Sequence, residues 1–136
     1  LQDRHSRPIL IAKDLLKRKK NTHQMIRSRL KFFPEHVRKT ITFDNGGEFA
    51  SHEKLNEIDC KTFFCDPCAS WQKGGLEHAN GGIKRFLPKD TDNDKISHAD
   101  IDKIQRKLNN MPMKCLNFKT PTEVFLNNIY NRRASN

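Results

Sequence analysis

The sequence lacks any long apolar run, and this excludes a membrane-spanning protein. No hydrophobic stretch reaches the roughly 18–20 residues that a helix needs to cross a bilayer. The opening residues, Leu-Gln-Asp-Arg-His-Ser-Arg, also lack the apolar segment of a secretory signal peptide. We therefore expect no membrane partner and a cytoplasmic location. In that compartment the four cysteines are expected to be reduced thiols.

Internal repeats and low-complexity segments are also absent, so nothing in the sequence indicates a repeat protein. Hydrophobic residues make up only 35% of the chain. With 136 residues, the chain has material for one domain with a modest core.

Acidic residues are scarce in the first third of the chain. Residues 1–40 contain 12 Lys and Arg against 3 Asp and Glu, whereas residues 41–136 contain 14 against 13. The formal net charge of +10 is therefore concentrated near the start. Such asymmetry favours a polyanionic partner, most plausibly nucleic acid, although a solvated basic face is the alternative. The candidates for sequence-independent contact with a DNA backbone are Lys17, Arg18, Lys19 and Lys20.

Short strands and helices alternate along the chain. β-Forming residues predict strands at residues 8–12, 39–43 and 61–65. Apolar spacing predicts helices near residues 22–33, 48–57 and 75–86. Capping signals at Ser97 and Thr120 open two further helices. This alternation predicts an α/β layered fold.

Two carboxylates occupy positions at which α/β proteins often hold ligands. Asp44 directly follows the strand at residues 39–43, and Glu77 lies one turn into the helix at residues 75–86. A carboxylate at a strand end and another on a helix can converge on Mg²⁺, which prefers oxygen ligands. Two such ions can assist phosphoryl transfer. Taken alone, a strand-end Asp and a helix Glu are far more often ordinary surface side chains than metal ligands.

Longer motifs surround these carboxylates. Residues 42–50 read Thr-Phe-Asp-Asn-Gly-Gly-Glu-Phe-Ala around Asp44, and residues 66–81 lead through Trp71 to Glu77 and beyond. Residues 108–116 and the Lys-Thr-Pro-Thr-Glu-Val-Phe motif of residues 119–125 follow in order. Together these motifs resemble the bacterial DDE transposases of the insertion-sequence-30 family, which have a retroviral-integrase-type catalytic core. The resemblance runs from about residue 1 to residue 125.

The resemblance implies a ribonuclease-H-like fold and a site that binds Mg²⁺ or Mn²⁺. Asp44 and Glu77 would be the second and third metal-binding catalytic carboxylates. The implied activity is the cutting and joining of DNA strands in transposition, with DNA as the partner and an oligomeric parent protein. Residues 1–125 would form part of this core, and residues 126–136 a C-terminal tail.

Several positions depart from the family pattern. The strand that carries the family's first catalytic Asp precedes the segment that residues 1–7 resemble, so we expect a chain truncated at its N-terminus. Leu76 and His78 replace Asn beside Glu77, and Met111 and Met113 replace Arg, which Met cannot match electrostatically. We therefore expect a weakly stable, incomplete core that is inactive alone.

Other residues near Glu77 are candidates for contact with DNA. Trp71 either stacks on a base or packs within its loop. Lys73, Lys84 and Arg85 either contact phosphates or form ordinary surface charge.

Two alternative functions remain open. The first is a DNA-binding remnant that retains affinity without chemistry. The second is a small zinc-binding module built on Cys60, Cys65 and Cys68, with His78 ten residues further on. A single C-x-x-C pair supports zinc only weakly, because buried cysteines also serve as small apolar side chains.

Overall fold

The chain divides into two compact units in the computed structural model, which describes residues 1–12, 22–43, 52–67, 74–88 and 90–133. The helical unit comprises residues 1–13 and 74–136. The sheet unit comprises residues 14–73.

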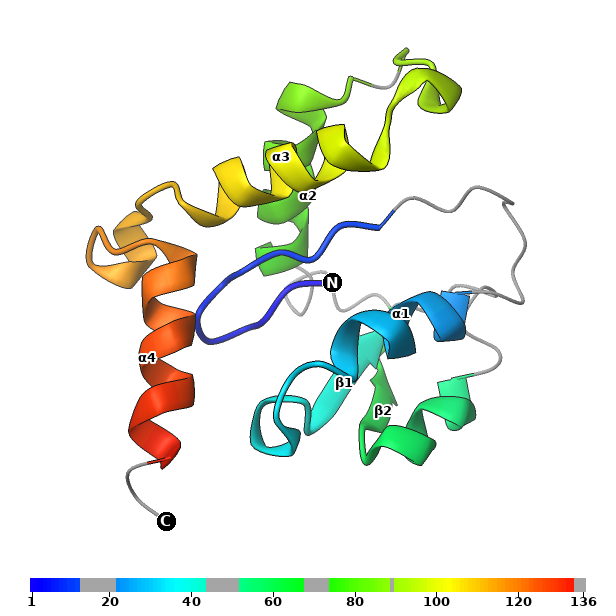
Figure 1. Ribbon diagram of the computed structural model, residues 1–136, viewed down its shortest axis with the longest axis vertical. Helices are drawn as coiled ribbons and strands as arrows, with labels where there is room; N and C mark the ends of the chain where they lie inside the picture. Colours follow the sequence, from blue (N-terminus) through cyan, green and yellow to red (C-terminus); the bar gives the residue numbers. More distant parts are fainter. Residues whose placement is uncertain (13–21, 44–51, 68–73, 89, 134–136) are drawn as a thin grey trace. The chain divides into compact units, whose positions relative to one another are not determined.

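The sheet unit is built on two short parallel strands (Figure 1). β1 (Thr40–Phe43) pairs with β2 (Lys61–Phe64), so that Thr40 lies opposite Lys61 and Phe43 opposite Phe64. The crossover between them contains the 3₁₀ helix η4 (His52–Ile58), and α1 (Thr22–Leu30) precedes β1. Strand, helical crossover and parallel strand make an α/β unit, which confirms the predicted class and both of these strands. Of the helix expected at residues 48–57, the described part is 3₁₀-helical.

The core of the sheet unit is small. Leu55 is fully buried, and the ring centroids of Phe43 and Phe64 lie 5.9 Å apart. The buried members of this cluster are Ile26, Phe43, Leu55, Ile58 and Cys60, whereas Phe64 is exposed. Ile26 reaches this cluster from α1, where its neighbour Leu30 packs against the same side chains at helical spacing. A core of this size agrees with the modest hydrophobic content of the sequence.

The helical unit contains α2 (Gly74–Phe86), α3 (His98–Asn109) and α4 (Pro121–Arg133). Reciprocal capping boxes open α3 and α4, as their sequences predict. Asp100 N donates to Ser97 Oγ at 3.1 Å, and Ser97 N donates to Asp100 Oδ2 at 3.0 Å. Thr120 N donates to Glu123 Oε2 at 2.7 Å, and Glu123 N donates to Thr120 Oγ1 at 3.2 Å.

Three further short 3₁₀ helices occur within the described residues. They are η2 (Glu35–Val37), η6 (Asn93–Lys95) and η7 (Lys114–Leu116). Across the described ranges, no helix is both long and apolar enough to cross a membrane.

The strand expected at residues 8–12 is instead the second arm of a short hairpin. Leu1 and Leu10 exchange backbone hydrogen bonds at 2.9 and 2.8 Å, and Gln2 and Ile9 form an isolated antiparallel bridge. The other edge of this arm meets side chains of α3 rather than a further strand. The blue segment beside α3 in Figure 1 shows this arrangement. The arm satisfies its backbone groups through amide side chains, so it needs no sheet partner on that side.

Candidate functional site: the exposed face of α2

α2 presents Glu77, Lys84 and Arg85, and its orientation is set by small residues on the opposite face. Ala79 is buried at 3% exposure. A Cβ added to Gly82 would lie 3.2 Å from Leu108 Cδ2 of α3, and one added to Gly75 would meet the Arg7 guanidinium. Because Gly75, Ala79 and Gly82 recur at helical spacing, they turn one face of α2 inward. The remaining face is left exposed.

Glu77 and Lys84 lie on this exposed face, two turns apart. Seven residues correspond to about 10 Å along a helix axis. Glu77 is in the first turn, where the helix dipole favours a carboxylate, and Lys84 and Arg85 are in the last turn. All three side chains are exposed. In this arrangement the Glu77 carboxylate can contact a metal ion while the Lys84 ammonium contacts a phosphate further along the same helix.

Asn80 and Gly81 lie between Glu77 and Lys84, and the sequence analysis missed them. Both are exposed, and a Cβ added to Gly81 would have nothing within 4 Å. Glycine inside a helix costs about 1 kcal/mol relative to alanine. Packing accounts for Gly82, but no described neighbour accounts for Gly81. Counting three and four residues on from Glu77 would have placed both residues on its face.

All of the other predicted catalytic, metal-binding and DNA-binding residues lie outside the described residues. These are Asp44, Lys17, Arg18, Lys19, Lys20, Trp71 and Lys73. The structure therefore brings Glu77 together with Lys84 and Arg85 on α2, and the pairing of Glu77 with Asp44 stays a prediction.

The donor chemistry of Glu77 suits a hard divalent cation. Its exposed carboxylate offers the oxygen ligands that Mg²⁺ and Mn²⁺ prefer. Among the described residues, no group of three or more His, Cys, Asp and Glu side chains is placed to hold a metal ion. Glu77 is therefore one suitable ligand that needs partners from elsewhere.

The cysteines of the zinc alternative serve as packing residues where the structure describes them. Cys60 belongs to the core of the sheet unit, and Cys65 is also buried. Burial raises the pKa of the Cys60 thiol, against an opposing effect of the Arg38 charge. Cys68 lies outside the described residues, and His78 is exposed on α2. The buried Cys60 thiol, with its raised pKa, fits a structural role better than metal ligation, which requires a thiolate.

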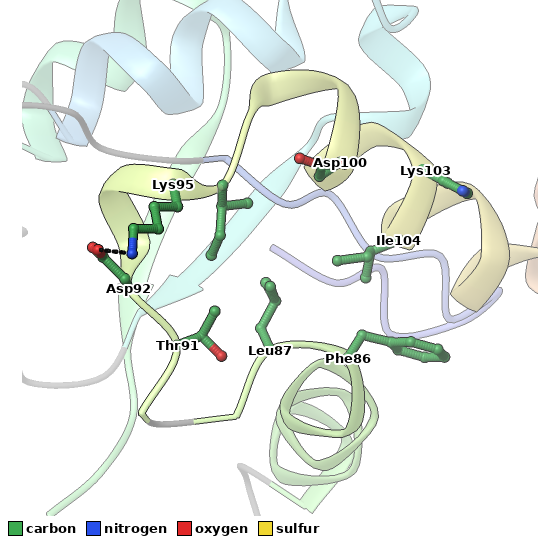
Figure 2. A pocket seen from close by; sticks show the side chains of 9 residues that line it. Phe86, Leu87, Thr91, Asp92, Lys95, Asp100, Lys103 and Ile104 are labelled. Atoms are coloured by element: carbon green, nitrogen blue, oxygen red, sulfur yellow. Dashed lines mark ion pairs between the residues drawn. The ribbon is translucent and has the colours of Figure 1, made fainter.

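A surface pocket of about 400 Å³ lies at the end of α2 that is remote from Glu77. Figure 2 shows Phe86 and Leu87 facing Ile104 of α3, with the ion pair between Asp92 and Lys95 at the rim. Neither Glu77 nor Lys84 lines it. The pocket is therefore separate from the candidate site.

Known proteins similar to this chain are transposases. Over 87 residues, 63% of the chain, it is 44% identical to a transposase for insertion sequence element IS4351 of Bacteroides fragilis. Over 125 residues, 91% of the chain, it is 35% identical to the transposase InsI for insertion sequence element IS30A of Escherichia coli (strain K12). A transposase for IS1086 of Cupriavidus metallidurans is 39% identical over 89 residues, or 65% of the chain. No protein-family model matches the chain.

The aligned regions cover 27%, 33% and 26% of these three relatives. The chain thus spans about a third or less of the length of the curated relatives that it matches. The expected resemblance is confirmed, because the matches share one type of protein and extend over most of this sequence. In sequence, this chain is therefore a relative of the IS30-type insertion-sequence transposases and corresponds to about a third of such a protein.

Proposed function

We propose that this chain is part of a transposase catalytic core in which Asp44 and Glu77 bind Mg²⁺ or Mn²⁺ during DNA cleavage and strand transfer. The proposal includes a ribonuclease-H-like fold, with residues 1–125 in the core and residues 126–136 as its tail. The main support is the exposed face of α2, on which Glu77 and Lys84 lie two turns apart. The sequence similarity to transposases supports the same conclusion. DNA is the proposed partner, and the intact parent protein is proposed to be oligomeric and cytoplasmic.

In this proposal α2 acts as a rigid support. Its inward face packs through Ala79 and Gly82, which fixes the direction of Glu77 without any contact from Glu77 itself. Such preorganisation lowers the cost of aligning reactants. A divalent cation bound there would polarise the attacking oxygen and neutralise charge on the scissile phosphodiester.

The rest of the exposed face suits the DNA backbone. Lys84 and Arg85 supply positive charge about two turns from Glu77, which suits phosphates next to the one that reacts. The missing side chain at Gly81 lets a strand approach the helix closely between Glu77 and Lys84. We propose that a DNA strand crosses α2 at this point.

Metal binding can be tested without activity, by adding Mn²⁺ to the ¹⁵N-labelled chain and following the broadening of amide signals. We expect broadening near both Asp44 and Glu77, because a paramagnetic ion acts only on nearby nuclei. Glu77→Gln should remove it. Glu53→Gln is the matched control, because Glu53 is another exposed acid in a first helical turn and its loss should change nothing.

The same titration separates the proposal from the DNA-binding remnant. The excess positive charge of the chain favours DNA affinity in either case. A chain that binds DNA but shows no Mn²⁺ broadening at Glu77 would be the remnant. Broadening at Glu77 that Glu77→Gln leaves unchanged would also contradict the proposed ligand.

A further inference from the structure

Phe118 combines two features that a folded chain normally avoids. Its side chain is 72% exposed, although it is one of the largest apolar side chains. Its backbone is left-handed, with φ 62°, directly after Asn117 with φ 53°. A left-handed conformation is sterically unfavourable for residues other than glycine, and Asn tolerates it better than Phe does. Packing does not compensate, because most of the ring faces solvent.

The loop around Phe118 is closed by its own backbone. Phe118 N donates to Met113 O at 3.0 Å, and Met113 N donates to Lys119 O at 3.1 Å. Asn117 N donates to Lys114 O at 3.1 Å. These bonds fix the position from which the ring projects. Glycine or asparagine at position 118 would close the same loop with less strain, so the loop geometry does not account for the aromatic ring.

The stretch of sequence around Phe118 is positively charged. No Asp or Glu occurs between Asp102 and Glu123. The intervening stretch carries five exposed cations, namely Lys103, Arg106, Lys107, Lys114 and Lys119. The carboxylate of Glu123 accepts a hydrogen bond from Thr120 N at the start of α4. An exposed aromatic ring in a basic loop that also carries Lys114 and Lys119 suits a strand of nucleic acid, which presents both bases and phosphates.

We propose that Phe118 stacks on an unpaired base of a DNA strand, with Lys114 and Lys119 contacting the flanking phosphates. Phenylalanine has no hydrogen-bonding group, so this contact would not select a base. A base inside a duplex is already stacked on its neighbours, so the site would prefer single-stranded or frayed DNA. The inference rests on the proposed DNA partner and adds a second contact to the face of α2.

Fluorescence anisotropy with the full chain tests this inference in EDTA, which removes any contribution of metal ions. The probes are a labelled 20-nucleotide oligothymidine, an abasic strand of the same length and a duplex. We expect Phe118→Ala to weaken binding of oligothymidine by about fivefold or more. Binding of the abasic strand should stay within about twofold of the unchanged protein, because charge alone holds that strand. Phe118→Trp should retain affinity, whereas Phe118→Leu should behave like Phe118→Ala.

Phe32→Ala is the matched control. Phe32 is 80% exposed, and Lys31 lies 5.0 Å from its ring centroid, so it shares exposure and a nearby cation with Phe118. It should change affinity for none of the probes. Circular dichroism of each variant distinguishes loss of the DNA contact from loss of the fold. Phe118→Trp provides a second variant, which keeps an aromatic side chain at this position.

Three results would overturn the inference. The first is unchanged oligothymidine binding by a folded Phe118→Ala variant. The second is equal weakening for oligothymidine and the abasic strand, which would assign Phe118 a structural role or a protein partner. The third is no binding of oligothymidine by the unchanged chain. Each is independent of Mn²⁺ broadening at Glu77, so the two proposals can fail separately.

Discussion

Asn109 of α3 makes both hydrogen bonds of the Ile9 backbone. Ile9 N donates to Asn109 Oδ1 at 2.7 Å, and Asn109 Nδ2 donates to Ile9 O at 2.9 Å. One helical turn earlier, Gln105 Oε1 accepts from Ile11 N at 2.7 Å. Four residues of helix span about 6 Å and two residues of strand span about 6.7 Å, so the two spacings match. Amides on α3 therefore replace a neighbouring strand.

Removal of either amide should release one residue of the hairpin arm. In Asn109→Leu, the Ile9 backbone loses both of its partners, and an unsatisfied buried group costs about 1–3 kcal/mol. We expect faster hydrogen exchange at the Ile9 amide, with the Ile11 amide still protected. Gln105→Leu should give the reverse pattern. Equal acceleration at both amides in either variant would contradict independent anchoring.

The adjacent glycines of α2 should respond differently to alanine. Gly81→Ala should stabilise the chain by up to about 1 kcal/mol, because alanine favours the helix and the new Cβ meets open space. Gly82→Ala should stabilise the chain less than Gly81→Ala does, or destabilise it, because the new Cβ would press on Leu108. Thermal unfolding measures the stability of both variants.

If a DNA strand crosses α2 at Gly81, the more stable Gly81→Ala variant should nevertheless bind DNA more weakly. Unchanged DNA binding by this variant would contradict that path.

Acid should weaken both capping boxes. Hydrogen bonds from Ser97, the side chain first and then the backbone, lower the pKa of Asp100. For Glu123 the backbone bond of Thr120 is the larger cause of the lowered pKa, followed by its side chain. A carboxyl with a lowered pKa in the folded state stabilises the fold above its unfolded pKa. This stability is lost as the pH falls through the folded value.

The corresponding measurement is urea unfolding between about pH 6 and pH 3, a range that spans ordinary carboxyl pKa values. Stability should fall through the lower part of this range. Ser97→Ala and Thr120→Ala should each flatten the fall, because each removes the hydroxyl hydrogen bond that helps to lower one of the two pKa values. An equally steep fall in both variants would place the acid sensitivity elsewhere.

The cysteines should differ in their rates of alkylation. Cys115 is exposed and should react first at neutral pH, whereas Cys60 is buried with a raised pKa and should react only when the sheet unit opens. Mass spectrometry after timed treatment with iodoacetamide identifies each site. Added Zn²⁺ should change none of these rates. Zinc-dependent protection of Cys60 and Cys65 would instead support the zinc-binding alternative.

Local chemistry allowed several elements to be predicted from the sequence. Ser97 and Thr120 predict the starts of α3 and α4, because each capping box is completed within four residues. The strands at Thr40–Phe43 and Lys61–Phe64 follow from β-forming residues beside turn signals. Glu77 was placed in the first turn of its helix for the same kind of reason.

Contacts between distant residues could not be predicted in this way. The anchoring of Ile9 by Asn109 joins residues 100 positions apart, and amide side chains carry no sequence signal for such a partner. The left-handed backbone of Phe118 depends on loop closure rather than on the residue itself. The metal-binding roles of Asp44 and Glu77 were predicted from the resemblance to transposases. Asp44 lies outside the described residues.

The hairpin arm also has a consequence for biosynthesis. The helical unit is discontinuous, because residues 14–73 separate its first segment from the rest. Ribosomes add residues from the N-terminus, and domains tend to fold as their parts emerge. The sheet unit can collapse while residues 1–12 still lack α3. Ile9 is thus synthesised 100 residues before Asn109 and can be held in place only after Asn109 has emerged.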